Sequence, residues 1–270
     1  MVTASINALL QTPSLARTFR TTADWIDLEW WALNASLIHA AQFAHGALLD
    51  VGCGDKPHEH IFRPYVSSYV GVEYDTTFSA TKASTHDRKA DVLYDGLTLP
   101  FADGSFDTVL SVQVLEHTPN PFELFAEMAR VLRDKGTLIL TVPFSGRLHE
   151  EPHDYLRFTP HMMRELCSRN GLKVNEIRAR GGFWSVLGHK LNSYLGFRVL
   201  RMGGLVQALG KVSQEAPLTA APRLWTLPVV APAMVAIAGS ARVLDRHLPD
   251  PTEMLGLLLI AERDDGATAR

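Results

Sequence analysis

Glycines and an acidic side chain follow apolar stretches in the first half of the chain, at a spacing suited to ligand binding. The segment DVGCGD contains Asp50, Gly52, Cys53 and Gly54 and follows an apolar run. Glycines let the backbone approach a ligand closely, and a helix that begins after such a turn can receive a negatively charged group. Glu73 lies 21 residues beyond Gly52, where an acid can accept hydrogen bonds from both hydroxyls of a ribose. These residues indicate a site for a ribose-containing ligand.

Two more polar segments follow later apolar stretches. Asp95 ends the run ADVLYD, and its carboxylate can accept a hydrogen bond from the exocyclic amine of an adenine. The segment SVQVLEH, residues 111–117, follows the next run. A nicotinamide dehydrogenase would need a glycine at the position of Pro57 to complete the pattern G-x-G-x-x-G, so the sequence disfavours that class. We expect Cys53 to be a small packing residue rather than a nucleophile.

Seven predicted strands position these residues. They alternate with helical segments, which is typical of a parallel sheet with helices on both faces. The predicted strands are 47–51, 68–73, 90–95, 106–112, 137–142, 172–178 and 255–261. We expect the last strand to pair antiparallel at or near an edge of the sheet. Ligands are expected at the carboxyl ends of the parallel strands.

Two helices between these strands have predicted ends. Asn120 is expected to cap a helix that begins at Pro121, and the turn 134–136 (Asp-Lys-Gly) is expected to end it. Thr159 and the proline after it predict the start of another helix, and the pair 170–171 (Asn-Gly) predicts its end.

Five motifs in a fixed order make the chain similar to a known family. They resemble the class I S-adenosylmethionine-dependent methyltransferases, most closely the branch that carries LPF, SFD and LEH motifs. The motifs are LLDVGCG (48–54), GVEYD (71–75), LPFADGSFD (99–107), QVLEH (113–117) and RVLRDKGTLILTVPF (130–144). The resemblance covers roughly residues 47–182. It implies an α/β fold with a Rossmann-like, doubly wound, mostly parallel sheet of seven strands, and S-adenosylmethionine as the cofactor.

The resemblance implies contacts with the methionine part of this cofactor. Asp50 and the loop of Gly52, Cys53 and Gly54 would contact the methionine moiety. Gln113 would line the pocket near the methyl group.

The nucleoside part of the cofactor would be held by the next two strand ends. Glu73 would bind the ribose hydroxyls, and Tyr74 would lie beside the adenine. Asp95, with the backbone of Gly96, would face the adenine amine. One departure from the family pattern concerns the third glycine of G-x-G-x-G, which is replaced by Lys56. A lysine there restricts the loop and is suited to a place near the carboxylate end of the cofactor.

A histidine-rich loop after the fifth strand provides candidate acceptor-site residues. The segment HEEPHDYLRFT (149–159) resembles one found in a bacterial subgroup of these methyltransferases. His149 or His153 can remove a proton from an acceptor hydroxyl near neutral pH. Arg157 can hold a phosphate or carboxylate, and Tyr155 is a second candidate for substrate binding.

Other roles for the same loop stay open. Asp154 and Arg157 would instead pair with each other to fix the loop, while Tyr155 and Phe158 pack. We expect no metal site, and the alternative is a metal bound by a set of three residues, His149, His153 and Glu150. His117 could act near the methyl group or make a structural hydrogen bond.

The composition limits the class of protein. The chain has 270 residues, of which 46% are hydrophobic and 20% charged, with a net charge of -3 and two cysteines. These values exclude a disordered chain, a collagen and a disulfide scaffold, and they give no argument for nucleic-acid binding. The first residues lack the long apolar run of a secretory signal, so we expect a cytoplasmic protein with reduced Cys53 and Cys167.

The pattern along the chain predicts four segments. They are an N-terminal helical appendage (1–46), a cofactor-binding core (47–182), an apolar and basic helical insertion (183–252), and the final strand with the tail (253–270). The insertion carries a net charge of +4, and the remaining 200 residues carry -7. The charge of the whole chain therefore hides two segments of opposite sign.

Three roles are open for the insertion. It could cap the core or form a homodimer contact through its apolar face. It could instead bind an anionic membrane at the inner face and give access to a lipid-linked acceptor, since apolar surface with basic flanks suits interfacial binding. The uncharged stretch 224–241 makes a poor transmembrane helix because it contains Pro228, Pro232 and Gly239.

The sequence therefore predicts a methyltransferase that acts on a small-molecule, glycan or lipid-linked acceptor, with oxygen as the expected methylated atom. The rival interpretation is a non-catalytic protein that keeps the fold as an S-adenosylmethionine-binding or membrane-associated scaffold. The acids at Glu73 and Asp95 argue against the loss of the cofactor site.

Overall fold

The computed structural model of the protein describes residues 24–75, 89–201 and 223–264. The chain forms two compact units. The sheet unit contains residues 35–180 and the strand that begins at Gly256, and the helical unit contains the segment up to Asn34 together with residues 181–255. The helical unit therefore groups two segments that are far apart in the sequence. Half of the predicted N-terminal appendage, residues 1–23, lies outside the described residues.

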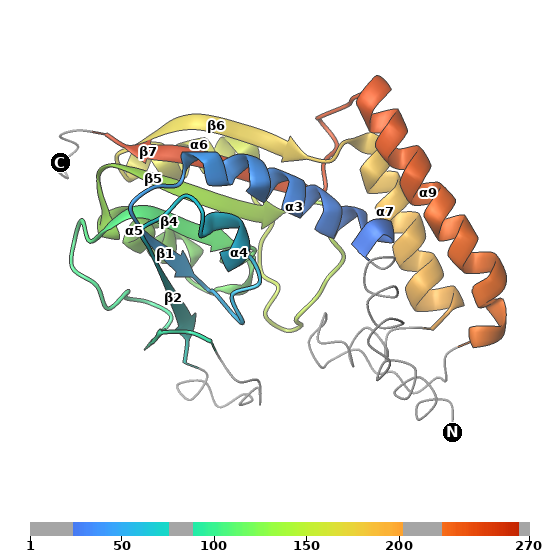
Figure 1. Ribbon diagram of the computed structural model, residues 1–270, viewed down its shortest axis with the longest axis horizontal. Helices are drawn as coiled ribbons and strands as arrows, with labels where there is room; N and C mark the ends of the chain where they lie inside the picture. Colours follow the sequence, from blue (N-terminus) through green and yellow to red (C-terminus); the bar gives the residue numbers. More distant parts are fainter. Residues whose placement is uncertain (1–23, 76–88, 202–222, 265–270) are drawn as a thin grey trace. The chain divides into compact units, whose positions relative to one another are not determined.

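A seven-stranded sheet forms the centre of the sheet unit (Figure 1). The strands lie in the order β3-β2-β1-β4-β5-β7-β6. Their bounds are β1 (Ala47–Val51), β2 (Ser68–Tyr74), β3 (Val92–Tyr94), β4 (Phe106–Val112), β5 (Leu132–Pro143), β6 (Leu172–Arg180) and β7 (Gly256–Arg263). The order reverses between β1 and β4, where a doubly wound sheet binds its ligands. The predicted Rossmann-like α/β fold class is confirmed.

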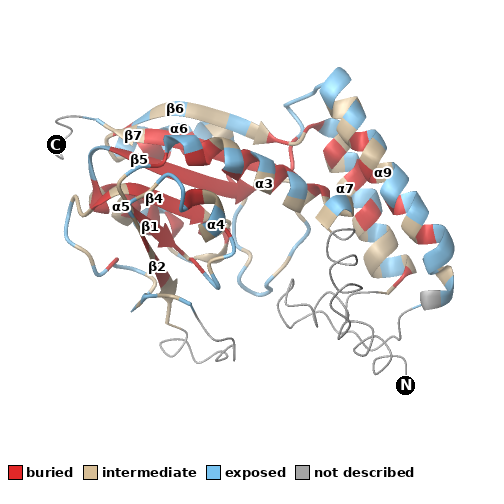
Figure 2. Ribbon diagram, viewed as in Figure 1, coloured by how far each residue is buried: buried red, intermediate tan, exposed pale blue. Residues whose placement is uncertain are grey.

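The strand pairing agrees with the predicted parallel strands and with the predicted antiparallel last strand. The pairs from β3 to β5 are all parallel, whereas β7 runs antiparallel to both β5 and β6. The last strand is thus one position inside the edge. β1, β4, β5 and β7 consist largely of buried residues (Figure 2), which explains their continuous apolar runs.

The helices of the sheet unit are short and come between the strands. They are the second half of α3 (Leu28–Ala40), the turn η1 (Ala41–Phe43), α4 (Glu59–Phe62), the turn η3 (Leu115–His117), α5 (Pro121–Val131) and α6 (Pro160–Arg169). α5 packs against β4 and β5, and α6 packs against β6 and β7. His39 Nε2 in α3 lies 2.9 Å from Glu176 Oε2 in β6. The helices are thus fixed to the sheet both by packing and by this polar contact.

One predicted helix end is correct and another is wrong. Thr159 caps α6, because its Oγ1 accepts a hydrogen bond from the backbone N–H of Met162 at 3.2 Å. α5 begins at Pro121 as predicted, but the side chain of Asn120 makes no capping hydrogen bond.

α5 also ends earlier than predicted, at Val131 instead of the turn 134–136. The backbone of Leu132 already pairs with Phe106 of β4, and the side chain of Leu132 is buried. A register shift follows, and Lys135 has a φ of 62°. The segment 134–136 therefore forms an irregularity within β5 and does not end the helix. Pairing of β5 with β4 outweighs the local preference of these residues for a turn.

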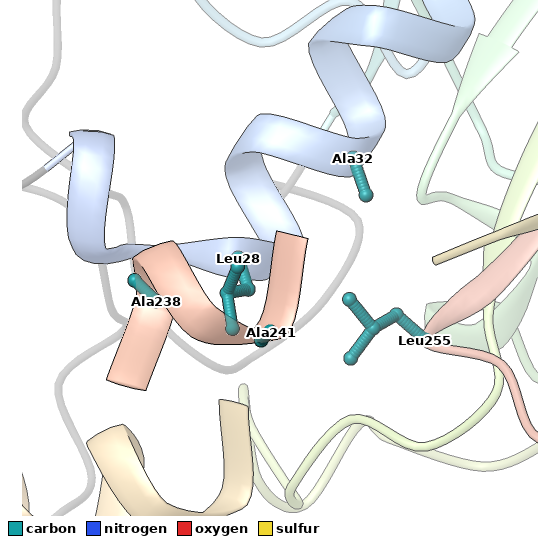
Figure 3. Close-up of a cluster of buried hydrophobic side chains, with 5 residues drawn as sticks. All are labelled: Leu28, Ala32, Ala238, Ala241 and Leu255. Carbon is teal, nitrogen blue, oxygen red and sulfur yellow. The ribbon is translucent and has the colours of Figure 1, made fainter. Parts of the chain in front are cut away.

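The helical unit consists mainly of helices. Its elements are the first half of α3, α7 (Phe183–Tyr194), the π-helical turn η4 (Leu195–Val199), the turn η5 (Leu224–Thr226) and α9 (Leu227–His247). Its core includes a cluster of Leu28, Ala32, Ala238, Ala241 and Leu255 (Figure 3). A Cβ atom on Gly188 of α7 would lie 2.8 Å from Leu28 and 3.0 Å from Ala241. A glycine here therefore allows close packing against α9.

A distant acid caps the N-terminus of α7. The carboxylate of Asp245 in α9 accepts hydrogen bonds from the backbone N–H groups of Gly182, Trp184 and Ser185, each at 3.0 Å. Amides in the first turn of a helix have no acceptor within the helix, and the helix dipole favours a negative charge at this end. Asp245 thus satisfies three donors at once and links α9 to α7.

Among the described residues, α9 is the one helix whose length and composition would allow it to cross a membrane. Its most apolar stretch has a mean hydropathy of 1.7, and 22% of that stretch is buried within the structure. Core helices of globular proteins can share these properties, so α9 alone gives weak evidence for membrane insertion.

Replacing Asp245 with alanine tests the link between α7 and α9. Three backbone donors lose their acceptor, so we expect the free energy of unfolding to fall by about 1–3 kcal/mol. Chemical denaturation followed by circular dichroism measures this change. Glu253→Ala, at an exposed position, is the control and should leave stability unchanged. Equal stability of Asp245→Ala and the wild type would contradict the capping role.

Candidate active site

The glycine loop after β1 is fixed by hydrogen bonds to β2. The backbone N–H groups of Gly52 and Cys53 both donate to the carbonyl oxygen of Val72, at 2.9 and 3.2 Å. Gly52 has a φ of 74°, and a Cβ atom there would lie 2.4 Å from the side chain of Val114. Gly54 has a φ of 49°, and no atom lies within 4 Å of the place where its Cβ atom would be. The loop therefore requires glycine at position 52 and leaves space beside position 54 for a ligand.

Lys56 takes the backbone conformation that the missing third glycine would favour. Its φ is 55°, in the left-handed region. Its Nζ donates a hydrogen bond of 2.6 Å to Asp91 Oδ2, which also accepts one from the backbone N–H of Gly71 at 2.7 Å. A Cβ atom on Gly71 would lie 2.5 Å from Lys56 Cε, so the lysine side chain crosses this glycine closely. The structure pairs the ammonium with Asp91 and gives no support for the predicted place near the carboxylate of a cofactor.

Glu73 ends β2 with both carboxylate oxygens held in place. Oε2 accepts a hydrogen bond of 2.7 Å from the backbone N–H of Gly54, and Oε1 accepts one of 3.0 Å from the backbone N–H of Tyr74. Each oxygen of a carboxylate has a second lone pair. Glu73 can therefore still accept hydrogen bonds from two adjacent hydroxyls, and its geometry fits a ribose.

Tyr74, Asp95 and Gly96 meet at the ends of β2 and β3. Gly96 has a φ of 83°, and a Cβ atom there would lie 2.9 Å from the ring of Tyr74. Asp95 Oδ1 accepts hydrogen bonds of 2.9 Å from the backbone N–H groups of Leu97 and Thr98. These two donors hold the pKa of Asp95 below its usual value. The structure thus brings the three residues together, and their contacts with an adenine stay a prediction.

Asp50 and Cys53 lie under the loop rather than at its surface. Only 4% of Asp50 is exposed, and the hydroxyl of Tyr69 donates a hydrogen bond of 2.6 Å to its Oδ2. Burial raises the pKa of Asp50 to about 7, and the nearby charge of Glu73 adds to this effect. Burial likewise raises the pKa of Cys53 to about 12, which favours an unreactive thiol. The structure therefore favours supporting roles for both residues.

Gln113 follows β4 and faces β5. Its φ is 56°, and its backbone N–H donates to the carbonyl oxygen of Thr141 at 3.0 Å. Its side-chain Nε2 donates to Thr141 Oγ1 at 3.2 Å. Both contacts fix Gln113 at the carboxyl ends of the two strands, and its predicted place near a methyl group stays untested.

Two of the three candidate histidines face each other. His117 follows β4, His149 follows β5, and their Nε2 atoms lie 3.1 Å apart. Nδ1 of His117 lies 2.8 Å from the carbonyl oxygen of His153. Nδ1 of His149 lies 3.1 Å from the carbonyl oxygen of Arg147. Burial lowers the pKa of His117, which favours its neutral form.

The third histidine lies at the exposed side of the loop. His153 Nδ1 is 2.8 Å from the hydroxyl of Tyr155, which is 44% exposed. The backbone N–H of Tyr155 donates to the carbonyl oxygen of Glu116 at 2.8 Å. The loop after β5 is thus attached to the segment that follows β4.

Asp154 and Arg157 form the ion pair that the sequence left as an alternative. The Arg157 guanidinium donates two hydrogen bonds to the buried carboxylate of Asp154, one of them 2.8 Å long from Nη2. The backbone N–H of His149 donates a third at 3.1 Å. Burial alone would raise the pKa of Asp154, but these donors lower it to about 2. Phe158 is buried, as the same alternative expects. Because the guanidinium of Arg157 is engaged by Asp154, the structure favours a role for Arg157 in fixing the loop over a role in substrate binding.

Glu116 belongs to this site, although the sequence analysis does not single it out. Its side chain is fully buried, and among the described residues neither carboxylate oxygen has a hydrogen-bond partner. Burial raises its pKa to about 8. The signal was the acid directly before His117 in the LEH motif, but burial cannot be read from the motif.

Comparison with known proteins matches part of the chain to one family. Residues 49–140 match the family described as a methyltransferase domain. An uncharacterized methyltransferase of Mycobacterium avium is 38% identical over 115 residues, which are 40% of this chain and 46% of that protein. One of Mycobacterium tuberculosis is 36% identical over 142 residues, which are 48% of this chain and 54% of that protein. The matched segments thus span about half the length of these curated relatives.

Solved structures give weaker likenesses. The Haemonchus contortus phosphoethanolamine N-methyltransferase 2, in complex with S-adenosyl-L-methionine, has a TM-score of 0.48 at 16% identity, covering 96% of this chain and 60% of that one. An S-adenosylmethionine-dependent methyltransferase from Mesorhizobium loti has a TM-score of 0.47 at 14% identity, covering 87% of this chain and 98% of that one. Likenesses of this size do not identify a substrate.

The match to the family and the relatives agrees with the geometry of the sheet unit. The glycine loop, Glu73 and Asp95 all fall within the matched segment, at the carboxyl ends of parallel strands. Residues 49–140 thus match a methyltransferase domain, and this match supports the resemblance to the class I S-adenosylmethionine-dependent methyltransferases.

Proposed function

We propose that this protein transfers a methyl group from S-adenosylmethionine to an oxygen atom of a small-molecule, glycan or lipid-linked acceptor. The observation that carries the proposal is the arrangement at one edge of the sheet. The glycine loop and Glu73 follow β1 and β2, and the histidine-rich segments follow β4 and β5. A donor site and an acceptor site would thus meet where the strand order reverses.

The residues at the ends of β1, β2 and β3 would hold the cofactor. The backbone of Gly52 and Gly54 would bind its methionine part, and Glu73 the ribose hydroxyls. Tyr74 and Asp95 would bind the adenine. The bound cofactor supplies a methyl group on a positively charged sulfur, which is already activated for transfer. The protein therefore has to align an acceptor oxygen with that methyl group and exclude water.

A histidine would remove the proton of an acceptor hydroxyl. Histidine titrates near neutral pH and is suited to general base catalysis. In His149, Nε2 faces His117 and Nδ1 faces a carbonyl oxygen. His153 is exposed and contacts the hydroxyl of Tyr155. This difference favours His153 as the base.

Replacing Glu73 with alanine tests the cofactor site. The substitution removes an acceptor for two hydroxyls and frees the amide of Gly54, so we expect the affinity for S-adenosylmethionine to fall roughly 10- to 100-fold. Isothermal titration calorimetry measures the affinity. Glu123→Ala, at an exposed position on α5, is the control and should bind like the wild type. Unchanged binding by Glu73→Ala would contradict the ribose role.

Replacing His149 and His153 in turn tests the base. The protein is first incubated with isotopically labelled S-adenosylmethionine and fractionated cell extract. The label is then measured in the soluble, lipid and macromolecular fractions to find the one that contains the methyl acceptor. Removing a general base should lower turnover by roughly 10²–10⁴-fold while the cofactor affinity stays unchanged. Unchanged turnover in both variants would contradict the histidine base. Cofactor binding without methyl transfer to any pool would favour the non-catalytic scaffold.

A lipid-linked acceptor would require access to a membrane surface. Trp225 and Val229 of the helical unit are 80% and 76% exposed, and Arg223 is near them in the chain. Apolar side chains with a basic residue are suited to an anionic bilayer surface. These residues support an interfacial contact through the segment 183–252.

Vesicle flotation tests this contact. We expect the protein to float with vesicles that contain phosphatidylserine, and to float less at high salt because charge attraction is screened. The double variant Trp225→Asp, Val229→Asp should stay in the bottom fraction. Vesicles of phosphatidylcholine alone are the control. Failure of the wild type to float with anionic vesicles would leave the capping and dimer roles for this segment.

A further inference from the structure

Three potential metal ligands converge between the ends of β4 and β5. Glu116 and His117 lie in the turn η3 after β4, and His149 lies in the loop after β5. One ligand atom from each lies within 4.8 Å of the other two. Parallel pairing of β4 with β5 brings these separate segments to the same edge of the sheet.

The surroundings of the two histidines fix their tautomers. Nδ1 of His117 lies 2.8 Å from the carbonyl oxygen of His153. Nδ1 of His149 lies 3.1 Å from the carbonyl oxygen of Arg147 and 3.3 Å from the carboxylate of Asp154. These oxygens accept hydrogen bonds and do not donate them, so each Nδ1 carries the proton. Nε2 of each neutral ring then presents a lone pair.

The two Nε2 atoms lie close together, and the rings meet edge to face with their centroids 4.7 Å apart. The Nε2 atoms of His117 and His149 are 3.1 Å apart, and such a contact needs either a proton shared between the nitrogens or a cation bound by both. Glu116 increases this need. Its fully buried carboxylate has no side-chain hydrogen-bond partner among the described residues, although its own amide and the charges of Arg157 and Arg180 favour its ionised form. Oε1 lies 3.7 Å from His117 Nε2. A buried carboxylate is costly unless a donor or a cation compensates it.

Two of the distances between the ligand atoms suit a small tetrahedral cation, and all three atoms lie within 4.8 Å of one another. Zinc binds histidine nitrogen and carboxylate oxygen at about 2.0–2.2 Å, which places neighbouring ligand atoms about 3.3 Å apart. The observed distances of 3.1 and 3.7 Å lie on either side of this value. Metal-bound histidines also usually donate their second N–H to a carbonyl or carboxylate, as both rings are placed to do here.

We propose that Glu116, His117 and His149 bind a divalent transition-metal cation of the zinc type. Three protein ligands leave a fourth position for water or for an oxygen of a bound molecule. The set shares only His149 with the set of His149, His153 and Glu150 considered from the sequence. With the cation bound, His149 is a ligand, and His153 is the histidine that stays available as a base.

Metal binding by the full chain tests the proposal without any methyl acceptor. The protein is stripped with a chelator and titrated with Zn²⁺ against a chromophoric competitor, and isolated protein is assayed by elemental mass spectrometry. We expect one equivalent of Zn²⁺ per chain. Glu116→Gln, His117→Ala and His149→Ala should each weaken binding by at least about tenfold, since each removes one of three ligands. Co²⁺ should give the visible absorption of a four-coordinate site in the wild type and lose it in the variants.

Two further variants serve as matched controls. His161→Ala removes an exposed histidine of α6, and His153→Ala removes a neighbouring histidine outside the set. Both should bind Zn²⁺ like the wild type. Circular dichroism tests whether each variant is folded. If a ligand variant is unfolded, the Zn²⁺ stoichiometry and the Co²⁺ spectrum of the wild type still show whether the protein has a four-coordinate metal site. Absence of Zn²⁺ binding by the wild type, or undiminished binding by folded ligand variants, would overturn the proposal.

Discussion

A pair of hydrogen bonds to one carbonyl oxygen determines the geometry of the candidate cofactor site. The amides of Gly52 and Cys53 both donate to Val72, so the loop after β1 turns across the end of β2. The following amide, that of Gly54, then reaches the carboxylate of Glu73. The glycine loop and the acid are thus one hydrogen-bonded unit. Its position depends on the parallel register of β1 with β2, where Val51 lies opposite Val72.

Parallel strand pairing also positions the histidine-rich segments that follow β4 and β5. β4 pairs with β5 in parallel, so the segments after them leave the sheet at the same edge. The backbone N–H of Tyr155 donates to the carbonyl oxygen of Glu116 and joins the two segments. Asp154 then fixes the loop internally through Arg157 and the amide of His149. Backbone pairing places the segments, and the ion pair of Asp154 and Arg157 helps to orient His149.

Elements of the fold could be predicted from the sequence where they depend on a local motif or on a continuous or periodic apolar pattern. Continuous apolar runs predicted the buried strands, and Thr159 predicted the start of α6. Local signals failed where a tertiary contact competed with them. The turn 134–136 looked like a helix end, yet pairing of Leu132 with Phe106 placed it inside β5.

Side-chain partners were harder to predict than strands. Lys56 could be recognised as a departure from the glycine pattern, but its partner Asp91 lies 35 residues away. The pairing of β3 with β2 brings Asp91 near Lys56. Glu116 could not be singled out from the sequence, because what distinguishes it is a buried carboxylate without a side-chain hydrogen-bond partner among the described residues. Neither property is encoded in the spacing of residues along the chain.

The place of β7 in the sheet has a consequence for synthesis of the chain. β6 pairs with β7 and not with β5, so β6 has no neighbour in the sheet until β7 is present. On the ribosome, the N-terminal strands emerge first, and β5 stays an open edge until Gly256–Arg263 has left the exit tunnel. An unpaired apolar edge can bind other chains. The nascent protein therefore passes through an interval in which protection of β5 by a chaperone would matter most.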